Sequence, residues 1–65
     1  SESRNREILI PNGIIETIDI KNDTLTVVVK VSTSHLEIVV MDLKDGILLN
    51  QYSVKQKKSL YNERN

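Results

Sequence analysis

Cysteine, phenylalanine and tryptophan are absent from this chain, and tyrosine occurs only twice. Without cysteine there is neither a disulfide nor a thiolate metal site to stabilise the fold. Without large aromatic side chains the core has to consist of isoleucine, leucine and valine. The 65 residues hold one domain at most, and such a chain buries only about 60% of the surface that its unfolded form exposes. We therefore expect a small aliphatic core.

An excess of charge of either sign is also missing, because nine basic residues balance nine acidic ones. No global field would draw the chain to nucleic acid or to an anionic membrane, so any such attraction has to be local. No apolar run approaches the roughly 18 residues of a membrane span, and the first seven residues are polar rather than signal-like. We expect a soluble protein or an excised domain that does not bind membranes, with a cytoplasmic location favoured.

Two valine-rich runs, residues 25–31 and 36–41, are the strongest positive signal in the chain. Alternate residues of a strand share one face, so the odd-numbered residues of the first run form one apolar face, and Val28 interrupts the polar one. In the second run we expect the even-numbered residues to face the core. Val39 and Met41 then point the other way.

Polar turns separate these runs from further apolar segments at regular intervals: residues 11–13, 21–23, 32–34 and 44–46. Proline, glycine, asparagine and aspartate favour turns, and short connections favour antiparallel neighbours. The sequence therefore predicts an all-β fold, a five-stranded antiparallel meander forming a small barrel or a curled sheet. We expect a polar N-terminal arm over 1–6, a single β domain over 7–54 and a short polar, basic C-terminal tail over 55–65 that is frayed or forms one helical turn.

Four apolar residues lie off the core face in this predicted register: Ile15, Val28, Val39 and Met41. Barrel closure, the tail or another chain could cover them. Barrel closure buries only one face and the tail is too polar to act alone, so we predict that these residues form an interface. The alternative is that they are ordinary surface residues of strands that favour β-branched side chains.

His35 is the one histidine, and it stands beside three hydroxyl residues with Glu37 two positions further on. Adjacent residues of a hairpin do not converge as a nucleophile, a base and an orienting acid must. A single imidazole with scattered carboxylates also lacks zinc-ligand spacing. We predict no catalytic residue, no metal site and no cofactor, so the protein is expected not to be an enzyme.

The tail holds the only local concentration of positive charge, with Lys55, Lys57 and Lys58 close to Tyr52. Binding of single strands usually combines such charge with aromatic platforms on which bases stack. One tyrosine is a thin platform, and the favoured explanation of the lysines is a solvated charged terminus that opposes aggregation of the strands.

We therefore predict a non-enzymatic protein–protein interaction or self-assembly module that uses a sheet edge and an apolar second face. A second copy or another protein would cover the sheet. The alternative is a small-barrel nucleic-acid-binding protein that uses the basic tail and the surface of the last strand, residues 47–54.

Overall fold

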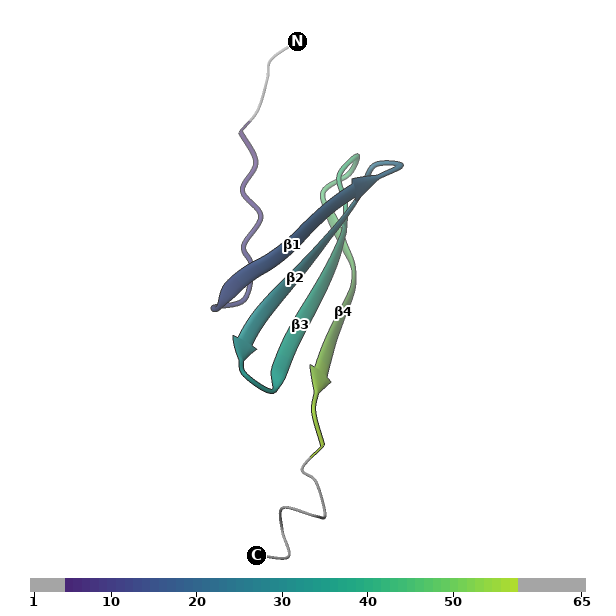
Figure 1. Cartoon of the computed structure of the whole chain (residues 1–65). Helices are drawn as coiled ribbons and strands as arrows, with labels where there is room; N and C mark the ends of the chain where they lie inside the picture. The colour runs from purple at the N-terminus through teal and green to yellow at the C-terminus, as the bar shows by residue number, and fades with distance from the viewer. Residues whose placement is uncertain (1–4, 58–65) are drawn as a thin grey trace, which may run out of the picture.

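A computed structural model describes residues 5–57 and shows one open sheet of four antiparallel strands (Figure 1). The strands are β1 (Ile14–Lys21), β2 (Thr24–Ser32), β3 (His35–Asp42) and β4 (Ile47–Lys55). They lie in the order β1-β2-β3-β4, so each strand pairs with its neighbour in sequence. The predicted all-β antiparallel meander is confirmed.

The prediction of a fifth strand was wrong, because residues 5–11 form no strand. This segment leaves the start of β1 and lies over one face of the sheet, where Ile10 packs against the buried cluster formed by Leu25, Val27 and Val29. Pairing beside β1 would have extended the sheet and left that apolar face uncovered. Pro11 also lacks the N–H that a ladder position requires.

The β1–β2 turn and the β3–β4 loop consist of the turn-forming residues that the sequence predicts there. Asn22 and Asp23 connect β1 to β2 with φ of 51° and 62°, the left-handed pair typical of a two-residue type I′ turn. Asparagine and aspartate tolerate this conformation better than other side chains do. The β3–β4 loop closes with Gly46 at φ 70° and its N–H donating to the Asp42 carbonyl at 2.8 Å.

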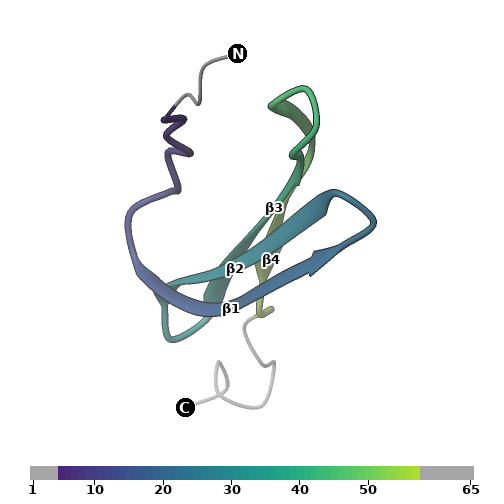
Figure 2. The ribbon, with the colours of Figure 1, turned by 90° about the horizontal axis from the view of Figure 1, so that it is seen from above.

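The β1–β2 turn and the β3–β4 loop lie at the same end of the sheet and are joined directly (Figure 1). The N–H of Leu43 donates to the carbonyl of Asp23 at 2.8 Å. Leu43 also packs against the buried cluster of β2. This end of the sheet is therefore tied by backbone hydrogen bonding and by apolar contact. Figure 2 shows the twist of the sheet from above.

The buried residues all lie on one face of the two central strands, which we call the core face. Leu25, Val27 and Val29 of β2 and Val39 of β3 are buried, and Val29 is fully enclosed. Met41 is partly buried against the same cluster. In contrast, every residue of the edge strands β1 and β4 is exposed. The core is thus one stripe along β2 and β3 rather than a closed interior.

A β-bulge at Val31 overturns the predicted orientation of β3. Lys30 pairs with Leu36 and Ser32 pairs with His35, which leaves Val31 as an extra residue without a partner. One extra residue exchanges the two faces of the following strand relative to β2. Val27 consequently faces the same side as Val39, and Val28 faces the same side as Ile38.

Gly13 occupies a position that no side chain can fill. A Cβ there would lie 2.5 Å from the carbonyl oxygen of Lys30, and φ is +150°. We expect Gly13→Ala to lower the free energy of unfolding by about 3 kcal/mol, measured by urea denaturation. Gly46→Ala is the matched control, because its Cβ would meet only the mobile end of Arg6, at 3.1 Å. It should cost about 1 kcal/mol, and equal losses would contradict the close approach at Gly13.

Val29→Ala should lower the free energy of unfolding by about 2 to 3 kcal/mol, because it removes two methyl groups from the one fully enclosed side chain and leaves a cavity. Val31→Ala, on the same strand but exposed in the bulge, should cost less than about 1 kcal/mol. Thermal unfolding monitored by circular dichroism measures both, and a smaller loss at Val29 than at Val31 would be inconsistent with the described core.

Candidate interaction surface

The face opposite the core face carries an apolar strip, which we call the second-face strip. It covers the β3–β4 half of that face, and its members come from β2, β3 and β4: Val28, Leu36, Ile38, Val40, Ile47, Tyr52 and Val54. The ladder places Val28, Ile38 and Tyr52 in one cross-strand row. The residues on β2 and β3 are partly buried by their neighbours, whereas those on β4 are exposed.

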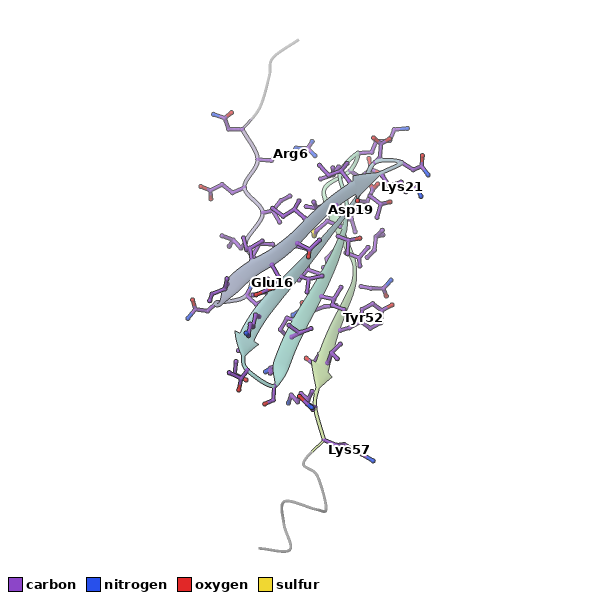
Figure 3. The ribbon with its side chains drawn as sticks, viewed as in Figure 1. Arg6, Glu16, Asp19, Lys21, Tyr52 and Lys57 are labelled. Carbon is purple, nitrogen blue, oxygen red and sulfur yellow. The ribbon has the colours of Figure 1, made fainter. Side chains whose placement is uncertain are left out.

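The strip has a polar border on one side only. On the β1 side the cross-strand rows continue into Thr17, Asp19 and Lys21. On the β4 side the strip runs out to the last strand, where Tyr52 is 51% exposed. Figure 3 shows Glu16, Asp19 and Lys21 along β1 and the Tyr52 ring projecting from the opposite edge. Among residues 5–57 no strand pairs with the outer side of β4.

The four residues predicted to share an interface are divided between the two faces. Val28 belongs to the second-face strip, but Ile15, Val39 and Met41 lie on the core face through their pairing with Val29, Val27 and Leu25. Placing all four on one face was wrong because two bulges shift the register: the one at Val31 reverses β3, and the one at Glu16 brings Ile15 opposite Val29. Val39, at 3% exposure, is now a core residue, whereas Ile15 remains half exposed at the sheet edge.

The core face also carries a polar clamp between β3 and β4, centred on the carboxylate of Glu37. Ser53 Oγ donates to Oε2 at 2.6 Å, Gln51 Nε2 donates to Oε1 at 3.2 Å, and His35 Nε2 lies 2.5 Å from Oε2. Glu37 is 9% exposed and stands opposite Val29. These bonds satisfy both oxygens, which is what a carboxylate beside an apolar core requires.

The hydrogen bonds of the clamp hold the pKa of Glu37 below its ordinary value. The Ser53 hydroxyl is the largest cause, followed by the Gln51 amide and the His35 imidazole, while desolvation acts weakly in the opposite direction. Donors that bond to the charged form stabilise it. The carboxylate is therefore ionised at neutral pH and joins the two strands by charge-assisted bonds.

The clamp contains a serine, a histidine and a carboxylate, but they are not arranged as a catalytic triad. A triad needs the histidine between the serine and the acid. Here Ser53 and His35 both bond to the same oxygen of Glu37, so the acid stands between them. Within residues 5–57 no three histidine, cysteine or acidic side chains are grouped to hold a metal ion.

The residues proposed for nucleic-acid contact are not gathered on one surface. Tyr52 pairs with Ile38 on the second face, whereas Lys55 pairs with His35 on the core face. Lys57 follows the end of β4 and is exposed (Figure 3). Lys58 lies outside the described residues, as does the expected helical turn of the tail. The aromatic platform and the nearest lysine of the strand therefore point to opposite sides of the sheet.

A groove separates the N-terminal segment from the β3–β4 half of the core face. It measures about 520 Å³ and is lined by apolar residues together with Glu7 and Gln51. Ile8 and Leu9, the side chains above it, are themselves exposed. The segment thus covers the core face only in part, and no charged side chain other than Glu7 lines this space.

Sequence reasoning missed Leu36, Ile38 and Val40 as surface residues, and Gln51 and Ser53 as partners of Glu37. The one available signal was the position of Glu37 in an otherwise apolar strand. A carboxylate there needs donors, and a strand with glutamine and serine two residues apart supplies them on one face.

Acidification should weaken the fold through Glu37. Because its pKa is lower in the folded chain, its contribution is complete above the unfolded carboxyl pKa of about 4.3 and is lost as the pH falls through the folded value. Glu37→Gln should therefore lower stability at pH 7 and flatten the decline of the free energy of unfolding below pH 4.3.

Ser53→Ala removes the largest cause of the shift, so it should move the acid limb of the stability profile to higher pH. Asn50→Ala changes a polar residue of the same strand on the other face and serves as the control. Urea denaturation from pH 2.5 to 7 measures all three variants. If Ser53→Ala and Asn50→Ala gave the same profile, the clamp would not account for the shift.

Among residues 5–57 there is no helix that is long and apolar enough to cross a membrane. Comparisons with protein-family models, with curated proteins and with solved structures found no match to the chain.

Proposed function

We propose that this protein is a non-enzymatic interaction module whose sheet is completed by a protein partner. The partner packs on the second-face strip, and backbone pairing at a sheet edge sets its orientation. The observation that carries this proposal is the continuous apolar row from Val28 through Ile38 to Tyr52, which reaches the sheet edge with no polar border.

The extent of exposed apolar surface supports a partner. The three members of the strip on β4, Ile47, Tyr52 and Val54, are each about half exposed, at 54%, 51% and 46%. Single apolar residues on a surface need no explanation, but contiguous groups of them usually mark a binding surface. The strip is contiguous by ladder pairing, which argues against isolated surface valines.

The energetic gain from covering the strip is large for a chain of this size. Burial is worth about 25 cal/mol for each Å² of apolar area removed from water, or roughly 1.5 to 3 kcal/mol for one large aliphatic side chain. A small single core supplies only about 3 to 5 kcal/mol in total. Because the members on β4 are about half exposed, covering them would add a stabilisation of the same order as the net stability of so small a chain.

The placement of the lysines favours this proposal over nucleic-acid binding. Tyr52 and Lys55 lie on opposite faces of β4, so a strand of bases stacked on the tyrosine would not follow that lysine. Phosphate contacts alone would give weak, salt-dependent binding without sequence preference. A titration with labelled single-stranded oligonucleotides at low and moderate salt should therefore show no saturable binding.

Val28→Lys should weaken the assembly at least about tenfold, because it places a charge at the β2 end of the apolar row, where a partner that covers the strip would desolvate it. Thr17→Lys introduces the same charge in the same cross-strand row but on the polar half of the face, and it should change the dissociation constant less than about threefold. Sedimentation equilibrium over a concentration series of the full chain measures the mass and the dissociation constant of each variant.

Two results would contradict the proposal. One is equal weakening by Val28→Lys and Thr17→Lys, which would indicate a general effect of charge. The other is a folded single copy of wild type at all concentrations that also captures no partner and melts at the same temperature whatever its concentration. Val39→Lys is not a test of the interface, since Val39 is buried in the core and the charge would unfold the chain.

A further inference from the structure

We infer that the partner at the sheet edge is a second copy of this chain, paired antiparallel along β4 about a two-fold axis that passes beside Tyr52. The inference rests on the proposed function and identifies the edge, the occupant and the register. Its result is one continuous eight-stranded sheet, in which the second-face strips of the two copies form a single surface.

The two free edges of the sheet differ in charge. β1 carries Glu16, Asp19 and Lys21 along its length, and Glu16 also forms a bulge (Figure 3). Charged side chains and bulges are the features that keep edge strands from pairing with other chains. β4 also has one bulge, but it has no acidic or basic residue from Ile47 to Val54, so its edge lacks the charged side chains that protect β1.

β4 also has the regularity that pairing needs. Its one bulge, at Leu49, lies near its start, and from Asn50 to Lys55 its register with β3 is uninterrupted. Six consecutive regular residues match the usual length of a strand in a sheet. Among the described residues, none hydrogen-bonds to the outer side of this stretch.

Two-fold symmetry restricts the register. Antiparallel copies of one strand in a single sheet are related by an axis perpendicular to the sheet, so the faces match and a residue must stand opposite itself. With Tyr52 on the axis, the two rings form an aromatic pair on the second face, and Asn50 stands opposite Val54 of the second copy. Cross-strand aromatic pairs stabilise antiparallel sheets.

The side chains of β4 on the core face are also compatible with this register. Gln51 and Ser53, which both bond to Glu37, would stand opposite Ser53 and Gln51 of the second copy. Two uncharged polar side chains would thus meet at each of these positions. Moving the axis to Ser53 would instead bring Lys55 against Gln51 and remove the tyrosine pair.

The size of the strip argues for doubling it. A face of four strands spaced about 4.8 Å apart, with eight residues rising about 3.4 Å each, projects about 500 Å², of which the apolar half is about 250 Å². A stable protein interface covers roughly 800 Å² on each partner. Joining two copies at β4 doubles the continuous apolar area to about 500 Å², which is closer to that size although still below it.

Single cysteines in β4 test this pairing, because the natural chain has none. Oxygen with a copper catalyst oxidises two neighbouring thiols to a disulfide, which a non-reducing gel detects. Tyr52→Cys should give the highest fraction of cross-linked dimer. Thr17→Cys, in the same row on the β1 edge, should give at least tenfold less.

A mixture of two variants tests the register. Asn50→Cys and Val54→Cys should cross-link to each other several-fold more than either does to itself. In the proposed register each residue lies two positions from the axis, so its own copy is about 13 Å away, beyond the reach of a disulfide. Cross-linking that favours the β1 edge, or that shows no preference along β4, would overturn the inference.

Repeating the cross-linking in Val28→Lys chains separates this inference from the proposed function. If β4 cross-links persist while association through the second-face strip is lost, both are supported. If Val28→Lys lowers the mass but β4 gives no cross-links, the interaction module stands and the two-fold pairing is wrong. Circular dichroism of each reduced variant confirms that it is folded before oxidation.

Discussion

The structure depends on one constraint: a single sheet has two faces, and within residues 5–57 only one short segment lies over either of them. β2 and β3 carry apolar side chains on both sides. The N-terminal segment lies over the core face and contributes Ile10 to the buried cluster. Within the described residues nothing lies over the second face, so the apolar content of the central strands exceeds what one layer can bury.

The same constraint explains why the N-terminal segment is not a strand. As an edge strand it would have gained backbone hydrogen bonds, but water supplies much the same bonds to an exposed edge, so the net gain per bond is small. As a cover it removes apolar surface of β2 from water. The glycine at position 13 makes this path available, because the chain turns there in direct contact with the backbone of β2.

The local features of the fold were predictable from the sequence. The face of the sheet on which each residue of β3 lies was not. Alternating valines identified β2 and β3, and turn residues identified every hairpin, because these signals lie within a few neighbouring residues. The bulge at Val31 leaves no comparable signal, yet it decides whether Val39 or Ile38 faces the core. The four observed strands were thus predicted, together with a fifth in the N-terminal segment that does not form. The candidate interface was divided between two faces, and the partners of Glu37 became apparent only with the register.

The sequence also does not show which valines are buried in the core and which lie on the candidate surface. A valine in a strand is expected on either face, and composition alone does not separate a core residue from an interface residue. The distinction arises from what lies above each face, and that depends on the path of residues 5–11. Val28 was assigned to the second face correctly because β2 has no bulge between Leu25 and Val29.

The meander has a kinetic consequence. Every strand pairs with the next one in the chain through connections of two or four residues. No long loop therefore has to close before two strands can pair. Folding rates fall as the sequence separation of contacts grows, and hairpins form within about 1–10 μs. Strand pairing can therefore begin at each turn and extend along the strands. We expect this sheet to fold faster than sandwiches and barrels that join distant strands.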